Sequence, residues 1–86
     1  MAKEPQPREI RCACVQFDVR RGDVEHNLAA VEQQLRIAAA EGATLAVLPE
    51  MWTTSFLADR DAAIVRASAR AEIRVLELSA ELDMMI

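Results

Sequence analysis

Three short runs of apolar residues, each bounded by polar or turn-forming residues, predict three β-strands. The first run, 10–17, is mostly apolar on both faces after Arg11, as expected of a buried parallel strand. The second run, 44–48, ends at Pro49, which cannot continue a central strand. The third run, 84–86, has the composition of the opening residues of a strand. We therefore expect strands at these three positions.

Two longer segments carry apolar residues three and four positions apart, which is the spacing of one helical face. The first segment begins after Asp23, a good N-cap, and ends before Gly42, a residue typical of the position after a helix. Its expected buried face consists of Val24, Leu28, Val31, Leu35 and Ala38. The second helix is expected from Asp59 or Asp61 to about Leu82. Its expected buried face consists of Ile64, Val65, Ala69, Ile73, Leu76 and Ala80.

The predicted order of elements is β-α-β-α-β, which makes residues 10–86 part of one α/β domain. Residues 1–9, which contain Pro5 and Pro7, are expected to form a flexible leader. Helices between apolar strands imply right-handed crossovers and a parallel sheet. Ligands bind such sheets at the carboxyl ends of the strands. Because Glu50 follows the second strand by two residues, the topology places this carboxylate where chemistry is expected.

Composition and charge narrow the classes of function. Apolar residues make up 52% of the 86 residues, which is enough for a packed core, whereas aromatic residues make up only 3%. Small aliphatic side chains must therefore fill the interior, which suits helices packed on a sheet. The formal net charge is −4 and the bases are not clustered, which argues against a nucleic-acid partner. Because no apolar run approaches the ~20 residues that span a bilayer, we expect a cytoplasmic protein without membrane contact.

Cys12 and Cys14 lie on the first predicted strand and point the same way. This spacing suits neither a mutual disulfide nor a structural zinc site, which needs four ligands. Buried structural thiols are the favoured interpretation, and a metal site or a reactive thiol are the alternatives. On the first helix, His26 is expected to have a surface role and Asn27 to tie the helix to a neighbouring loop. No metal or other cofactor is predicted.

A set of spaced motifs runs from the first strand to the loop after the second. The motifs are Val15-Gln16-Phe17-Asp18, Gly22-Asp23, Asn27-Leu28, Gly42-Ala43 and Leu45-Ala46-Val47-Leu48-Pro49-Glu50-Met51. Their combination resembles the N-terminal part of the nitrilase superfamily, the carbon–nitrogen hydrolases, over about residues 11–86. The run 50–56 is closest to the ω-amidase-like branch. In that branch glycine is expected where this chain has Ser55 and Asp83.

The resemblance implies an α-β-β-α sandwich, of which this chain supplies the beginning, and a Glu-Lys-Cys triad. In the family the glutamate is the general base, the cysteine attacks an amide or nitrile carbon, and the lysine stabilises the developing charge. A thioester forms and water hydrolyses it. The glutamate corresponds to Glu50, whereas the family's lysine and cysteine lie downstream of this loop, beyond Ile86. The one lysine here is Lys3, and Cys12 and Cys14 match no nucleophile motif.

The loop after the second predicted strand holds the remaining candidate site residues. The apolar neighbours Met51 and Trp52 are expected to bury Glu50. Trp52 and Phe56 are the candidate substrate-binding residues, because their rings could line a pocket beside the carboxylate. Packing between the loop and the second helix is the alternative role for both rings.

Two functions from different classes follow. The first is an enzyme segment: part of a carbon–nitrogen hydrolase acting on a small amide, ω-amide-like, or a nitrile, whose full-length form is a homo-oligomer. The second is a truncated, non-catalytic module that acts only as a fragment or as an interaction partner. The second is considered because the 86 residues alone provide no nucleophile beside Glu50, so the isolated chain is expected to be inactive. Such a chain would also leave a sheet edge open and one apolar sheet face uncovered, where a partner could bind.

Overall fold

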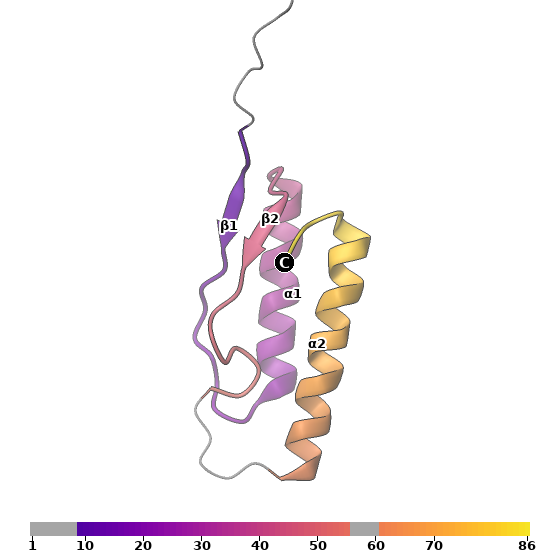
Figure 1. Cartoon of the computed structure of the whole chain (residues 1–86). Helices are drawn as coiled ribbons and strands as arrows, with labels where there is room; N and C mark the ends of the chain where they lie inside the picture. Colours follow the sequence, from indigo (N-terminus) through magenta and orange to yellow (C-terminus); the bar gives the residue numbers. More distant parts are fainter. Residues whose placement is uncertain (1–8, 56–60) are drawn as a thin grey trace, which may run out of the picture.

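The computed structural model describes residues 9–55 and 61–86, which form a small α/β arrangement (Figure 1). The elements follow one another as β1 (Cys12–Cys14), α1 (Val24–Ala40), β2 (Leu45–Val47) and α2 (Ala62–Leu82). This order confirms the predicted alternation of strands and helices. Of the leader expected over residues 1–9, only Glu9 belongs to the described residues.

The two strands pair in parallel, as a crossover helix between them requires. The paired residues are Cys12 with Leu45, Ala13 with Ala46, and Cys14 with Val47. Both strands are shorter than predicted. The ladder nevertheless extends beyond β1, because the amide of Val15 donates to the carbonyl oxygen of Val47 at 2.9 Å.

The third predicted strand, at 84–86, is present as a single bridge. Met85 pairs in parallel with Leu45 of β2. The amide of Met85 donates to Thr44 at 2.9 Å, and the amide of Ala46 donates to Met85 at 2.8 Å. Since Leu45 and Ala46 also belong to the strand that pairs with β1, the chain begins a third position in the sheet, on the other side of β2.

Helix α1 has the boundaries that its caps predict. The carboxylate of Asp23 accepts a hydrogen bond from the amide of His26 at 3.1 Å, which satisfies one free amide of the first turn. At the other end Glu41 is the C-cap and Gly42 follows it with φ +89°, a left-handed conformation that glycine adopts without steric cost. The predicted buried face is confirmed at four positions, and Leu28 is half-buried against the core.

Helix α2 begins at the second of the two predicted caps. Asp61 accepts a hydrogen bond from the amide of Ile64 at 2.8 Å. The helix ends at Asp83, which has φ +50° and a left-handed conformation. This is a position at which the family resemblance leads us to expect glycine, and the positive φ gives the physical reason for that expectation.

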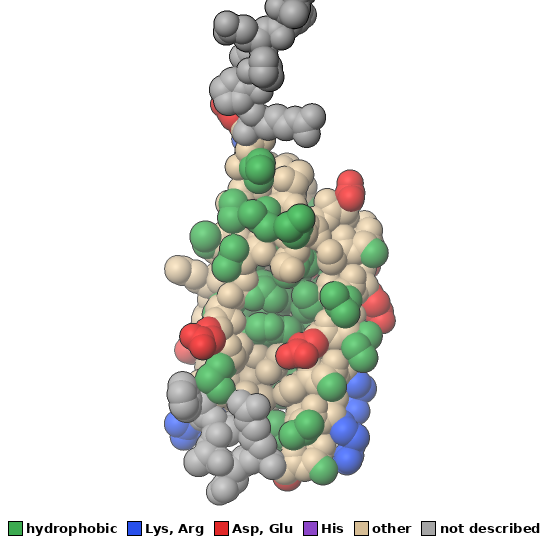
Figure 2. All heavy atoms as spheres, viewed as in Figure 1, with side chains coloured by type: hydrophobic (Ala, Val, Ile, Leu, Met, Phe, Trp, Pro, Cys, Tyr) green, Lys and Arg blue, Asp and Glu red, His purple; other side chains and the backbone are tan. Residues whose placement is uncertain are grey.

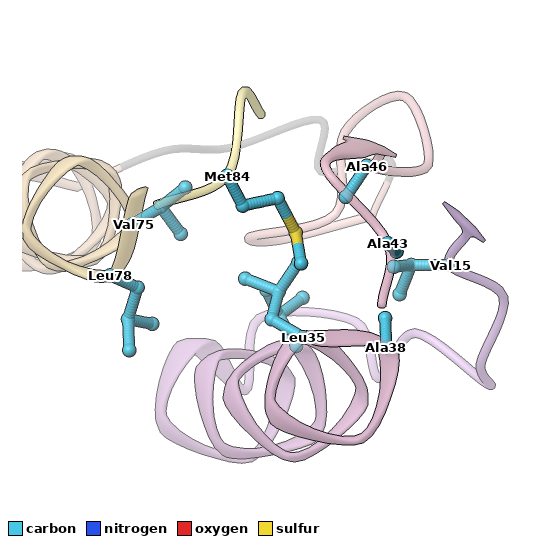
Figure 3. Close-up of a cluster of buried hydrophobic side chains, with 9 residues drawn as sticks. Val15, Leu35, Ala38, Ala43, Ala46, Val75, Leu78 and Met84 are labelled. Atoms are coloured by element: carbon cyan, nitrogen blue, oxygen red, sulfur yellow. The ribbon is translucent and has the colours of Figure 1, made fainter. Parts of the chain in front are cut away.

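The hydrophobic core lies between the two helices and the sheet (Figure 3). Its buried members are Val15, Val31, Leu35, Ala38, Ala43, Ala46, Val75, Leu78 and Met84. Figure 3 shows the side chain of Met84 extending from the end of the chain toward Leu35 of α1. The third sheet position therefore contributes to the same core as β1 and β2.

The prediction for the buried face of α2 is wrong. The buried residues of this helix are Ala71, Val75 and Leu78, whereas Ile73 and Leu76 are 55% and 71% exposed. Both sets of residues have helical spacing and are apolar, so periodicity alone cannot choose between them. The structure therefore gives α2 two apolar faces, of which the one with Ala71 packs on the core.

Ion pairs join α2 to α1 in the rotation that turns the Ala71 face inward. The guanidinium of Arg74 contacts the carboxylate of Glu32 on α1 at 2.7 Å, and Arg36 of α1 contacts Glu81 at 3.0 Å. The hydrogen bonds to Glu32 and then to Glu77 raise the pKa of Arg74 above its usual value. The pairing of Arg74 and Glu81 with α1 favours one rotation of α2, in which Ile73 and Leu76 remain outside.

The face of the sheet turned away from the helices is apolar and exposed (Figure 2). Because side chains alternate along a strand, Cys12, Cys14 and Val47 point to this face while Ala13 and Ala46 point to the core. The prediction of buried thiols is therefore wrong for this chain, since Cys12 and Cys14 are both exposed and free. The physical reason is that the described residues place both helices on the opposite face.

Candidate active site

A tight turn follows β2 and carries Glu50. Residues 50–54 form turns, and the amide of Ser55 donates to the carbonyl oxygen of Met51 at 2.8 Å. Met51 and Ser55 have φ values of +54° and +59°. Left-handed backbone at residues other than glycine costs about 1–3 kcal/mol and persists where surrounding contacts determine it. The residue directly after Glu50 is thus held in an unfavourable conformation.

Glu50 lines a hollow of about 390 Å³ at the carboxyl ends of the strands. The other lining residues are Phe17 and Val19, from the segment after β1, and Met51 and Ser55. The carboxyl ends of neighbouring parallel strands lie at the same edge of a sheet, and ligands bind there. The arrangement places one carboxylate at the edge of a partly apolar recess.

Of the three predicted site residues, Glu50, Trp52 and Phe56, the structure describes the first two and places them in different surroundings. Glu50 is exposed, so the expectation that Met51 and Trp52 bury it is wrong for this chain. Trp52 is half-buried and packs against the hydrophobic core. Phe56 lies outside the described residues. A substrate-binding role for Trp52 and Phe56 stays a prediction.

A buried side chain on α1 connects the two loops that follow the strands. Asn27 is fully buried, and its Oδ1 accepts a hydrogen bond from the amide of Arg20 at 2.8 Å. Its Nδ2 donates to the carbonyl oxygens of Arg20 and Thr53, both at 2.8 Å. A further bond joins the same loops directly, from the amide of Gly22 to the carbonyl oxygen of Thr54 at 2.9 Å. We call these five residues the interloop tie.

Sequence reasoning anticipated only part of this arrangement. The prediction that Asn27 ties α1 to a neighbouring loop is confirmed, and the structure adds that it joins two loops. A signal was available, because Asn27 interrupts the apolar face of the first helix next to Leu28. Phe17 and Val19 were missed as lining residues of the recess. Their place directly after the first strand was the signal, since neighbouring strand ends converge in a parallel sheet.

Two other kinds of site are absent from the described part of the chain. Across residues 9–55 and 61–86, no three His, Cys, Asp or Glu side chains gather in a way that could hold a metal ion. Within the same residues, neither helix has the length and apolar character needed to cross a membrane. Among the residues that line the recess after β2, Glu50 is the one with a carboxylate.

Comparison with known families gives one match. The family model described as Carbon-nitrogen hydrolase matches residues 11–86, which is nearly all of the chain and includes both strands, both helices and the Glu50 turn. No curated protein and no solved structure matches the chain.

Proposed function

The chain belongs to the carbon–nitrogen hydrolase family, and from this premise we propose that Glu50 is the general base of a hydrolase site. The proposed substrate is a small amide, of the ω-amide kind, or a nitrile. The triad's lysine and cysteine are supplied, in this proposal, by residues beyond Ile86. The complete protein is proposed to be a cytoplasmic homo-oligomer with the α-β-β-α sandwich of the family.

The proposed reaction divides one difficult hydrolysis into two steps. Glu50 takes the proton of the cysteine thiol, and the thiolate attacks the carbonyl carbon of the amide. The lysine stabilises the negative charge that develops on the oxygen. Glu50 then gives the thiol proton to the amide nitrogen as the carbon–nitrogen bond breaks, so that ammonia leaves, a thioester remains and Glu50 is again a carboxylate. Water, deprotonated by Glu50, then attacks the thioester, releasing the carboxylic acid and the free thiol.

The observation that carries the proposal is the position of Glu50 at the edge of the recess after β2. A general base must reach the proton that it removes, which an exposed carboxylate at a strand end can do. The positive φ of Met51 adds support, because strained backbone clusters at functional sites. The apolar wall formed by Phe17 and Met51 would exclude water once the rest of the site is in place.

The test is the Glu50→Gln variant of the complete protein that carries this chain. Gln keeps the size of the side chain but cannot accept the thiol proton, so kcat for a small amide should fall by about 10²- to 10⁴-fold. Glu72→Gln is the matched control, because Glu72 is an exposed glutamate on α2 and its variant should keep full activity. If Glu50→Gln is as active as Glu72→Gln, the proposal is wrong.

A second candidate function is an interaction module, and the exposed apolar sheet face favours it. Val47 is 53% exposed and pairs with the exposed Cys14, and Met85, which is 71% exposed, bridges to the other side of β2. Such a surface favours pairing with another polypeptide. Under this proposal the 86-residue chain hydrolyses no amide and acts as a fragment or binds a partner. Amide turnover by the purified 86-residue chain that is lost in Glu50→Gln would contradict it.

A further inference from the structure

Asn27 makes three hydrogen bonds in the interloop tie and uses both N–H groups and the oxygen of its side-chain amide. Its oxygen accepts from one backbone amide, and its two N–H groups donate to two backbone carbonyl oxygens. The donors and acceptors around it also fix the orientation of the amide. An aspartate at this position would offer no N–H to the two carbonyls, and a leucine would offer no polar atom. Asparagine is therefore matched to this site by chemistry as well as by size.

One of the two carbonyls that Asn27 binds belongs to the turn that carries Glu50. Thr53 lies between Met51 and Ser55, the two residues with positive φ. Such a backbone persists only when other contacts hold it. The hydrogen bonds present are those from Asn27 to Thr53 and from Gly22 to Thr54 and, within the turn, those from the amide of Ser55 to Met51 and from the hydroxyl of Thr54 to the carbonyl oxygen of Ser55.

The other carbonyl that Asn27 binds belongs to Arg20, in the segment between β1 and α1. The same segment contributes Val19 to the recess beside Glu50. Asn27 therefore holds both walls of the recess from a single point on α1, a helix whose neighbouring residues Val24 and Val31 are buried.

We propose that Asn27 is a positioning residue that holds the turn of Glu50 against the segment after β1, so that the carboxylate faces the recess. The inference rests on the proposed role of Glu50 as general base. Asn27 itself touches no reacting atom in this proposal. It acts through the backbone of Thr53, and its loss should displace Glu50 without removing the carboxylate.

The experiment compares Asn27→Asp with Val31→Ala in the complete protein. Asn27→Asp keeps the shape of the side chain and removes both N–H donors of the tie. Val31→Ala damages the core one turn further along α1, where Val31 is fully buried, and leaves the tie intact. We expect Asn27→Asp to lower kcat by about 10²-fold with KM little changed, since a small misplacement of a catalytic group has that effect. Val31→Ala should leave kcat unchanged below its melting temperature.

Two further readouts separate a failure of this inference from a failure of the proposed function. In a double-mutant cycle, Asn27→Asp should cause no additional loss in the Glu50→Gln background, because it acts through Glu50. Hydrogen exchange of the Gly22 and Ser55 amides, which reports on the tie without any activity, should accelerate in Asn27→Asp and not in Val31→Ala.

The outcomes are distinct. Faster exchange with unchanged kcat would overturn the positioning role while confirming the tie. Unchanged exchange would overturn the inference whatever happens to activity. A Glu50→Gln variant with full activity would overturn the proposed function first, and the exchange result would still show whether Asn27 holds the turn. If Asn27→Asp does not fold, Asn27→Ser, which keeps one O–H donor, replaces it in the same comparisons.

Discussion

The two apolar faces of α2 lead to a prediction that compares two leucines on one helix. Leu78 is fully buried, whereas Leu76 is 71% exposed. Replacing Leu78 by Ala removes buried carbon atoms and leaves a space between α2 and the core residues that surround it, including Val75 and Met84. Replacing Leu76 by Ala removes a side chain that is mostly in contact with water.

The expected losses of unfolding free energy differ several-fold between the two variants. Leu78→Ala deletes three buried carbons, at about 0.8 kcal/mol for each, so the transfer term alone is about 2.4 kcal/mol. The cavity adds to this, and measured losses for buried Leu→Ala changes are about 2–5 kcal/mol. Leu76→Ala should change the free energy of unfolding by no more than about 0.5 kcal/mol. The free energy of unfolding of a small domain is only about 5–15 kcal/mol, so Leu78→Ala removes a large part of its stability.

The assay is urea unfolding followed by circular dichroism at 222 nm, with both variants measured beside the unchanged protein. A shift of the midpoint without a change of slope reports a change in stability. If the two variants lower the free energy of unfolding by similar amounts, or if Leu76→Ala lowers it more, α2 does not present its Ala71 face to the core. The ion pairs with α1 would then not determine its rotation.

Three smaller changes test other features by direct measurement. Asp61→Ala should lower the free energy of unfolding by about 1 kcal/mol because the amide of Ile64 loses its acceptor, and Asp61→Ser should recover most of it in the same urea titration. Ser55→Gly should raise stability by about 1 kcal/mol because φ is +59°, whereas a Val at this position should lower it. Cys12 and Cys14 should both react with a thiol reagent without denaturant in the 86-residue chain, and slow reaction of either would mean that the outer sheet face is covered.

The elements of the fold that depend on local chemistry could be predicted from the sequence. Asp23 and Gly42 mark the ends of α1 because capping involves only residues of the adjacent turn. The buried face of α1 could also be predicted, since its apolar residues form one stripe. The buried face of α2 could not, because its second apolar stripe has the same spacing and the choice depends on contacts with other elements, of which the pair between Arg74 and Glu32 on α1 is one.

In the candidate site, too, some features could be predicted from the local sequence and others could not. The position of Glu50 at a strand end follows from strand order and from Pro49, both of which are visible in the sequence. The exposure of Glu50 and the packing of Trp52 on the core depend on how the turn folds back, which is determined by contacts distant in sequence. The bond between Asn27 and Thr53 joins residues 26 positions apart, and no local pattern specifies such a pair.

The interloop tie also has a consequence for how this region tolerates sequence change. Asn27 and Gly22 bind backbone atoms of Thr53 and Thr54, not their side chains. These bonds therefore do not depend on which side chain is present, although both threonines are buried and the hydroxyl of Thr54 donates to the carbonyl oxygen of Ser55 at 3.0 Å, so replacements must be of similar size. Inserting or deleting a residue in either loop is different, because it moves the carbonyls out of register with a fixed helix. The lengths of the two loops are therefore coupled. Grafting one loop onto another scaffold requires transfer of the other loop and of Asn27 as well.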